Sequence, residues 1–134
     1  MDCVFCKIIK KEIPAEIIYE DAKSLVFLDI APVHPGHSLI VPKEHHATLT
    51  DTPLDLACHL MSVVKKVAPA IMQATNANGY NVGINNDAAA GQVVFHTHYH
   101  LIPRFTNDGL KLWPHQTYQE GQMKTVADRI RKEI

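Results

Sequence analysis

Three histidines alternate along one short segment of the chain, at positions 96, 98 and 100. In a β-strand successive side chains point to opposite faces, so this spacing places all three imidazoles on one face. The surrounding run, from Val93 to Pro103, is rich in β-branched and aromatic residues, which favours a strand. Histidine can act as a nucleophile, a general acid or base, or a metal ligand. Three aligned imidazoles therefore indicate a chemical site.

The residues around this segment favour a phosphate as the ligand. Gly91 and its small neighbours let the backbone approach a ligand closely, and loop N–H groups can bind an anion. Asn85 and Gln92 supply neutral amide donors, and Arg104 supplies a positive charge just past the strand. A neutral imidazole can attack phosphorus. His98 has a histidine on either side and is the natural nucleophile.

The chain contains three cysteines, of which Cys3 and Cys6 form a Cys-x-x-Cys pair and Cys58 stands alone. In a reducing compartment such a pair indicates metal binding or redox chemistry. A thioredoxin-like pair would follow a strand in a βαβ unit, which this pair does not. We therefore expect a zinc half-site whose other ligands are histidines from elsewhere in the chain. Cys58 is expected to be a small buried residue of a helix.

Composition describes an ordinary globular chain. Its 134 residues are enough for one domain, with 46% hydrophobic and 20% charged residues. The formal net charge of −1 offers no electrostatic basis for nucleic-acid or membrane-surface partners. No signal-peptide pattern follows Met1, and no apolar run has the length of a membrane span. We expect a cytoplasmic protein.

Hydrophobic periodicity predicts an α+β fold. Alternation and turn residues predict strands at 16–20, 24–30, 37–42, 80–85 and 93–103. A long helix should start with Thr52 as N-cap and Pro53 at its first position, and Pro69 should kink it or end it early. A short helix is expected around 123–130. The predicted architecture is a mostly antiparallel sheet of about five strands with two helices packed on it.

The histidine segment resembles the signature of the histidine triad (HIT) family of nucleotide hydrolases and transferases. The residues that carry the resemblance are Gly91-Gln92-x-Val94-x-His96-x-His98-x-His100-x-Ile102-Pro103-Arg104. Three further segments are similar to the family: Cys3-Val4-Phe5-Cys6-Lys7-Ile8-Ile9, Phe27-Leu28-Asp29-Ile30-x-Pro32, and Gly36-His37-Ser38-Leu39-Ile40-Val41-Pro42-Lys43-Glu44-His45. The resemblance covers residues 3–104 of a single domain over 1–134, with a tail and helix at 105–134. The cysteines favour the Hint-like branch over the Fhit branch.

The resemblance implies an enzyme with a covalent mechanism. His98 would attack the α-phosphorus of a nucleoside phosphoramidate or a dinucleoside polyphosphate and form a nucleotidyl-histidine. Water would then release a nucleoside monophosphate. His100 would hydrogen-bond the phosphoryl or bridging atom, and His96 and His37 would complete the histidine network.

The resemblance also implies how a nucleotide, with a purine as the expected base, would be held. Asn85 and Gln92 would contact the phosphate. Asp29 would bind the ribose hydroxyls, for which a carboxylate is a suitable acceptor. Phe27, Ile30 and Leu39 would form apolar walls for the base, although ordinary core packing explains these three residues equally well.

Family members with this Cys-x-x-Cys imply a closed structural zinc site here, made of Cys3, Cys6, His45 and His96. His46 is the alternative to His45. On an extended segment the two adjacent side chains point opposite ways, so only one of them can serve. The resemblance further implies a homodimer, in which Trp113 of the tail either reaches the partner's site or packs locally.

One departure from the family concerns the leaving group. Hint-type enzymes usually carry a hydroxyl residue directly after the glutamine, and this chain has Val93 there. Valine cannot donate a proton, so we expect slower cleavage of phosphoramidates here, and a smaller effect on dinucleoside polyphosphates, whose leaving group is already a phosphate. Two alternatives remain at this point: a nucleotide-binding regulatory module with vestigial catalysis, and a metalloenzyme that uses the three histidines as catalytic ligands.

Overall fold

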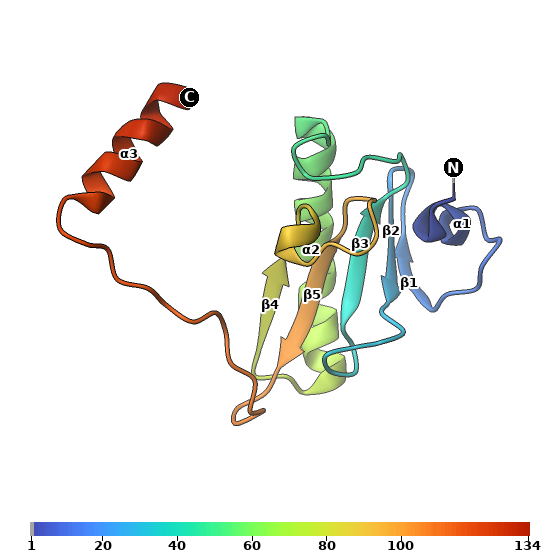
Figure 1. Ribbon diagram of the computed structural model, residues 1–134. Helices are drawn as coiled ribbons and strands as arrows, with labels where there is room; N and C mark the ends of the chain where they lie inside the picture. Colours follow the sequence, from blue (N-terminus) through green and yellow to red (C-terminus); the bar gives the residue numbers. More distant parts are fainter. Residues whose placement is uncertain (1) are drawn as a thin grey trace.

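The structure is a computed structural model that describes residues 2–134 (Figure 1). Its elements are α1 (Val4–Ile9), β1 (Ile17–Glu20), β2 (Ser24–Leu28), β3 (Ser38–Pro42), α2 (Leu54–Thr75), β4 (Gly79–Gly83), η1 (Ala88–Ala90), β5 (Tyr99–Arg104) and α3 (Gln122–Glu133). The strands form one sheet in the order β1-β2-β3-β5-β4, and every neighbouring pair is antiparallel. The predicted α+β fold class is confirmed.

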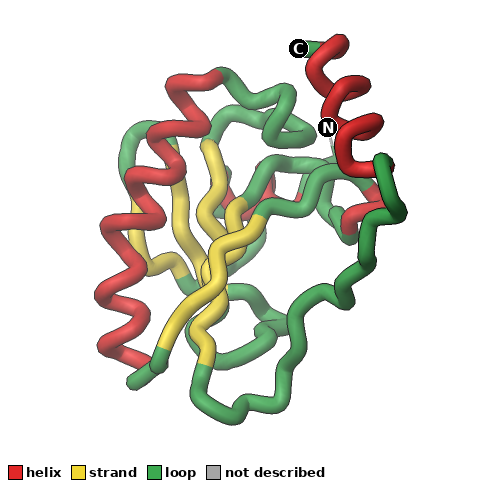
Figure 2. Tube along the Cα trace, turned by 90° about the vertical axis from the view of Figure 1, so that its left-hand side faces the viewer, coloured by secondary structure: helices red, strands yellow, loops and turns green. Residues whose placement is uncertain are grey.

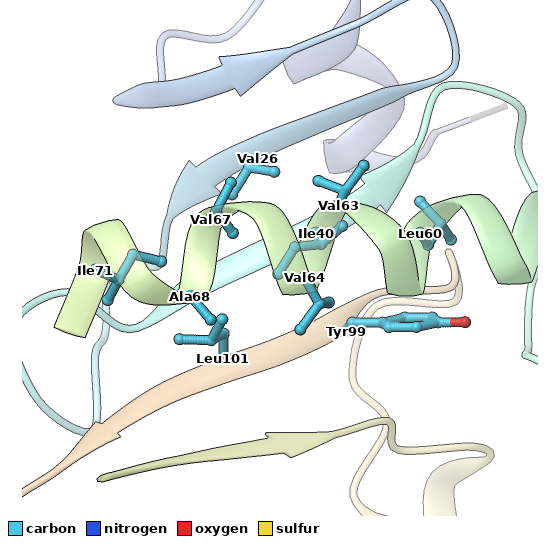
Figure 3. Close-up of a cluster of buried hydrophobic side chains, with 10 residues drawn as sticks. All are labelled: Val26, Ile40, Leu60, Val63, Val64, Val67, Ala68, Ile71, Tyr99 and Leu101. Atoms are coloured by element: carbon cyan, nitrogen blue, oxygen red, sulfur yellow. The ribbon is translucent and has the colours of Figure 1, made fainter. Parts of the chain in front are cut away.

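The two faces of the sheet are covered by different helices. Alternate residues of the strands, Val26, Ile40, Tyr99 and Leu101, pack with the apolar stripe of α2 in one buried cluster (Figure 3). On the opposite face, Phe27 and Leu39 join Phe5 and Ile8 of α1 in a second cluster. Because Tyr99 and Leu101 of β5 point toward α2, the histidine between them points toward the α1 side.

Helix α2 buries one apolar stripe, which consists of Leu56, Leu60, Val63, Val64, Val67, Ala68 and Ile71. Three details differ from expectation. Pro69 lies on the exposed side, and the helix runs through it to Thr75, because the buried stripe on both sides holds the backbone in place. Pro53 occupies the N-cap position, since Thr52 donates its hydroxyl to the Thr48 carbonyl instead. Cys58 is exposed because it falls between the stripe positions.

The predicted packing of the C-terminal helix on the sheet is wrong. Helix α3 contains no buried residue and stands away from the sheet at the end of an extended tail (Figure 1). Figure 2 shows the same tail leaving the sheet at the end of β5. The second packed helix is instead α1, which the sequence reading did not predict. Among residues 2–134, no helix is both long enough and apolar enough to cross a membrane.

The histidine segment is a strand only in its second half. Strand β5 begins at Tyr99, and residues 94–96 form a bend, so the predicted strand over 93–103 is too long. The cause is a contact with another loop: the Thr97 N–H donates to the His46 carbonyl at 2.7 Å. The Thr97 and Thr52 hydroxyls are also bonded, at 2.9 Å. The bend separates His96 from the two later histidines.

Candidate active site and metal site

His96 turns toward the N-terminal cysteines. Its Nδ1 atom lies 3.5 Å from Cys3 Sγ and 3.6 Å from Cys6 Sγ. His45 Nδ1 lies 3.4 Å from Cys6 Sγ and 3.1 Å from His96 Nδ1. The four ligand atoms lie within 4.8 Å of one another. The structure therefore brings together the four residues of the expected metal site.

These spacings match a tetrahedral zinc centre. With bonds of about 2.3 Å to sulfur and 2.0–2.1 Å to nitrogen, tetrahedral geometry separates sulfur from nitrogen by about 3.6 Å. The same geometry separates two nitrogens by about 3.3 Å. The observed sulfur–nitrogen distances are 3.4–3.6 Å and the nitrogen–nitrogen distance is 3.1 Å. Two thiols and two imidazoles are also a donor set that zinc prefers, so the residues fit this metal.

The other ring nitrogen of His96 confirms its orientation. His96 is fully buried, and its Nε2 donates to the Pro42 carbonyl at 2.8 Å. This bond places the proton on Nε2 and leaves Nδ1 with a lone pair for a metal. His46 points elsewhere and pairs with Glu44 at 3.0 Å, so His45 is the histidine that joins the cluster.

A backbone contact determines the tautomer of His98. Its Nδ1 lies 2.7 Å from the His96 carbonyl oxygen, which can only accept a hydrogen bond. Nδ1 must therefore carry the proton, and Nε2 keeps its lone pair. His98 is 7% exposed and lines a cavity on the α1 side of the sheet. The arrangement leaves a neutral imidazole with its nucleophilic nitrogen available.

In His100 the proton lies on the opposite ring nitrogen from that of His98, and the contact with His37 determines this. The Val33 N–H donates to His37 Nδ1 at 3.1 Å, so the proton of His37 resides on Nε2. That Nε2 donates to His100 Nδ1 at 2.9 Å. His100 must then carry its own proton on Nε2. The rings of His98 and His100 are 4.9 Å apart, which places a nucleophile and a hydrogen-bond donor side by side.

Burial keeps these histidines neutral. It lowers the pKa of both His37 and His98 below the ordinary value. It also lowers the pKa of His100 from 6.5 to about 4, with smaller contributions from repulsion by His98 and His37. A neutral His37 is what its acceptor role toward Val33 requires, and a neutral His100 can accept at Nδ1 while donating at Nε2.

The lowered pKa of His100 predicts a pH-dependent stability. Between pH 6.5 and about 4 the unfolded chain binds a proton at this residue that the folded protein does not. The free energy of unfolding therefore falls as the pH is lowered through this range. Urea titrations measure this effect. Between pH 7.5 and 5.0 we expect the free energy of unfolding to fall by about 2 kcal/mol less in His100→Asn than in wild type. His115→Asn, in the exposed tail, is the control, and parallel curves for wild type and His100→Asn would contradict the assignment.

The cavity beside His98 has a volume of about 470 Å³ and is lined mainly by apolar side chains. Phe27 and Leu39 form part of its buried wall, whereas Ile30 lies at its edge with its side chain 99% exposed. Asp29 also lines the cavity, and its Oδ2 lies 3.7 Å from His37 Nε2 while Oδ1 accepts the Ala31 N–H. The Asp29 carboxylate lies beside His37 and His100, and the ligand atoms of these three residues are within 4.8 Å of one another.

The loop after β4 closes the same cavity. Asn85 and Gly91 both line it. Gly91 has a φ of +89°, a conformation that favours glycine, and an added Cβ would lie 3.8 Å from Asn85 Nδ2. The backbone conformation therefore accounts for glycine at position 91, and the close approach of the backbone to a ligand stays a prediction.

Gln92 differs from its expected role. Its side chain is buried, with Oε1 accepting from the Asp87 N–H and Nε2 donating to the Ala47 and Val94 carbonyls. The amide is thus used to hold the loop, and it does not line the cavity that His98 lines. His96 likewise lies with Cys3, Cys6 and His45, and the bend before β5 keeps it out of the lining of that cavity.

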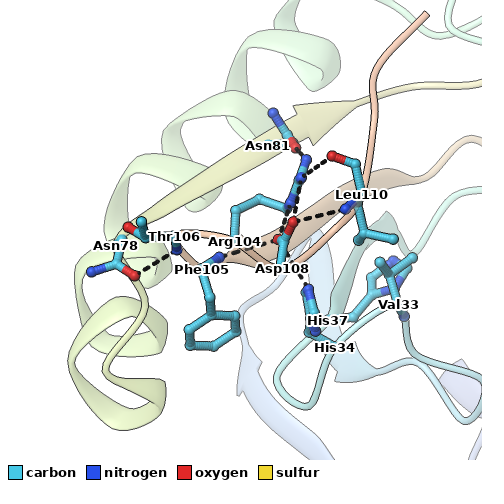
Figure 4. Close-up of polar contacts among 10 residues, drawn as sticks. All are labelled: Val33, His34, His37, Asn78, Asn81, Arg104, Phe105, Thr106, Asp108 and Leu110. Carbon is cyan, nitrogen blue, oxygen red and sulfur yellow. Dashed lines mark hydrogen bonds and ion pairs between the residues drawn. The ribbon is translucent and has the colours of Figure 1, made fainter.

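Sequence reasoning missed a network that anchors the tail. Arg104 donates to both carboxylate oxygens of Asp108, at 2.7 and 2.9 Å, and to Asn81 at 2.8 Å (Figure 4). His34 pairs with the same carboxylate, and the Arg104 guanidinium holds the pKa of Asp108 well below its usual range. The four-residue spacing of these opposite charges is a signal only in a helix, and Arg104 instead ends β5 while Asp108 follows a turn.

This network shapes a second cavity beyond His100. It has a volume of about 590 Å³ and shares His100 and Asn85 with the first cavity. Trp113 of the tail lines it and is 84% exposed. His100 therefore stands between two open spaces, one on the side of His98 and one beneath the tail.

Comparison with known proteins accounts for this arrangement. The sequence model of the protein family described as "HIT domain" matches residues 10–107 of this chain. The chain belongs to the HIT family. Adenosine 5'-monophosphoramidase hnt1 of Schizosaccharomyces pombe is 39% identical over 100% of this chain and 99% of its own length. Adenylylsulfatase HINT3 of Arabidopsis thaliana is 46% identical over 92% of this chain, which spans only 61% of that relative.

A solved HIT structure bears on the metal site. The Zn-bound histidine triad family protein from Mycobacterium smegmatis has a TM-score of 0.79 and 36% identity, covering 100% of this chain and 99% of that one. Its fold agrees with the sheet and helices described above.

The relatives named above confirm two predictions. This HIT protein belongs to the Hint-like group, and it is a hydrolase that acts on phosphorus-containing bonds of nucleotides.

Proposed function

We propose that this HIT protein hydrolyses nucleoside phosphoramidates or dinucleoside polyphosphates at the α-phosphorus and releases a nucleoside monophosphate. The proposal rests on one observation: hydrogen bonds place the protons of two adjacent histidine rings on different ring nitrogens. His98 offers a lone pair at Nε2, and His100 offers a proton at Nε2. Both line one cavity, which also contains Asp29.

The proposed reaction has two steps. His98 Nε2 attacks the α-phosphorus, and the bond to the leaving group breaks with its electron pair passing to that group. The His100 Nε2–H hydrogen-bonds a phosphoryl or bridging atom as charge develops there. Water then attacks the nucleotidyl-histidine, its proton is released, and His98 leaves as the free imidazole. The sum is one water consumed, one nucleoside monophosphate and one protonated leaving group formed.

The lining of the cavity supports binding of a nucleoside. Asp29 would accept hydrogen bonds from the ribose hydroxyls, and the apolar wall of Phe27 and Leu39 would contact the base. Ile30, with its exposed side chain at the rim, would cover the base, and Asn85 would contact the phosphate. The backbone of the loop at Gly91 would take the phosphate contact that the side chain of Gln92 cannot make.

Two further features complete the proposal. A structural zinc ion would be held by Cys3, Cys6, His45 and His96, where it stabilises the fold. The protein would act as a homodimer, which sedimentation can test. This is supported by the edge strand β4, with exposed Tyr80 and Val82, and by the apolar residues that α3 leaves exposed.

The proposal is tested with adenosine 5'-phosphoramidate and diadenosine polyphosphate as separate substrates for the zinc-loaded protein. Release of AMP, followed by chromatography, is the expected result. Binding of AMP without turnover of either substrate would instead support the regulatory module. Guanosine and cytidine analogues of the phosphoramidate then show whether the site prefers a purine.

Val93 allows the leaving-group prediction to be tested by a single substitution. Its side chain is 86% exposed and lines the cavity, so serine is accommodated without loss of packing. A hydroxyl there can donate a proton to a departing amine. We expect Val93→Ser to raise turnover of the phosphoramidate by about tenfold. This is less than the roughly 10²–10⁴-fold that a well-positioned general acid contributes. Turnover of the dinucleoside polyphosphate should stay within about twofold, and Val93→Thr should reproduce the gain. An equal change for both substrates would contradict this role.

A further inference from the structure

The metal site and the nucleotide cavity share one short helix. Cys3 is the N-cap of α1 and Cys6 lies in its first turn, so two of the four metal ligands are on this element. Val4, Phe5 and Ile8 of the same helix line the cavity beside His98. Helix α1 therefore has the metal ligands on one side and a wall of the cavity on the other.

Phe5 makes the closest connection between the two. It sits between the cysteines in the sequence and is 7% exposed. Its ring lies 5.0 Å from the His98 ring at an interplanar angle of 86°, and 5.9 Å from the His96 ring at 73°. It also contacts Phe27 at 5.4 Å. Edge-to-face contacts of this kind fix ring orientation. One side chain thus touches a metal ligand, the nucleophile and the apolar wall.

Helix α1 depends on such contacts for its position. It has six residues, which is too short for a helix to be stable without tertiary support. A metal bound at Cys3, Cys6, His45 and His96 would fasten it to the segments that precede α2 and β5. Without the metal, packing alone holds it, and the cavity wall loses its anchor.

We propose that Phe5 is a positioning residue through which metal binding raises the affinity of the cavity for a nucleotide. The inference rests on the proposed function, because it takes the cavity beside His98 as the nucleotide site. Coupling between two sites is reciprocal, so a bound nucleotide must tighten metal binding by the same factor.

Calorimetry with AMP tests the coupling on the full chain. We expect the Kd for AMP to rise about tenfold when the zinc-loaded protein is stripped with a chelator, a typical size for coupling between sites. Zinc affinity, measured against a chromophoric chelator, should rise by the same factor when AMP is saturating. Equal Kd values for AMP in loaded and stripped protein, with circular dichroism showing both folded, would overturn the coupling alone. Failure of the loaded protein to bind AMP would overturn the proposed function as well.

Phe5→Leu separates the positioning role from general stability. This variant keeps an apolar side chain but loses the ring, and we expect it to retain zinc and bind AMP about tenfold more weakly. Removal of zinc should then change its Kd for AMP by less than about twofold. Leu25→Val is the matched control, because Leu25 belongs to the same buried cluster without lining the cavity. Wild-type affinity for AMP in zinc-loaded Phe5→Leu would overturn the proposal, even where the stripped protein does not fold.

Discussion

We expect His98→Ala to lower phosphoramidate turnover by at least about 10⁴-fold while the protein stays folded, as removal of a covalent nucleophile does in other enzymes. His98 is the ring whose Nε2 lone pair faces the cavity, because its Nδ1 proton is committed to the His96 carbonyl. His100 cannot replace it, since its Nδ1 accepts from His37 and its Nε2 carries a proton. The measurement is AMP release at saturating substrate.

A trapping experiment identifies the residue directly. Wild type mixed rapidly with substrate and quenched in alkali should gain the mass of one nucleotidyl group on the peptide that contains His98. The control is His115→Ala, which changes an exposed histidine of the tail and should keep both turnover and adduct. An adduct on any other residue would falsify the assignment of the nucleophile.

The same variant decides whether the histidines are catalytic metal ligands. Within residues 2–134, His98 belongs to neither group of side chains that could hold a metal ion, which are Cys3, Cys6, His45 and His96, and Asp29, His37 and His100. We therefore expect His98→Ala to keep the zinc content of wild type in elemental analysis. Loss of the metal together with activity would point to the metalloenzyme alternative instead.

The second large effect concerns the metal site. We expect Cys6→Ser to reduce bound zinc from one per chain to near zero and to lower the melting temperature by about 10 °C or more. Removal of one ligand opens the tetrahedral site, and metal-binding free energy is folding free energy in a structural site. Helix α1 and its contacts with Phe27 and Leu39 should be lost first, because the cysteines lie on that helix.

Cys58→Ser is the matched control for this prediction. Cys58 is exposed on α2 and lies outside the metal cluster, so the same chemical change there should alter neither zinc content nor melting. Zinc-free wild-type protein, together with unchanged melting of Cys6→Ser, would rule out the structural metal.

Periodic features of the structure could be predicted from the sequence. Each of the five strands lies within or near its predicted range, and the stripe of α2 matches its helical spacing. The four residues that the resemblance implies as zinc ligands also lie together in the structure. Patterns of period two and near 3.6 reflect burial against a neighbouring layer, and they are visible before the fold is known.

The features that could not be predicted depend on contacts between distant segments. The bend before β5 exists because Thr97 bonds to the backbone at His46, and Gln92 is held by the carbonyl of Ala47. No local pattern encodes either contact. Helix α3 shows the converse, because its apolar stripe is periodic but meets no partner within the described chain, residues 2–134. Amphipathic spacing predicted the helix correctly but could not say where it packs.

The polarity of the histidine pair has a consequence for the evolution of the site. It originates in two main-chain groups, the N–H of Val33 and the carbonyl of His96, rather than in side chains. Most amino acids at position 33 would therefore keep the N–H that donates to His37 and leave the direction of this hydrogen bond unchanged. Proline is the exception, because it lacks the N–H that orients His37. The proton positions in this site therefore depend partly on the course of the backbone, which a comparison of side chains alone does not reveal.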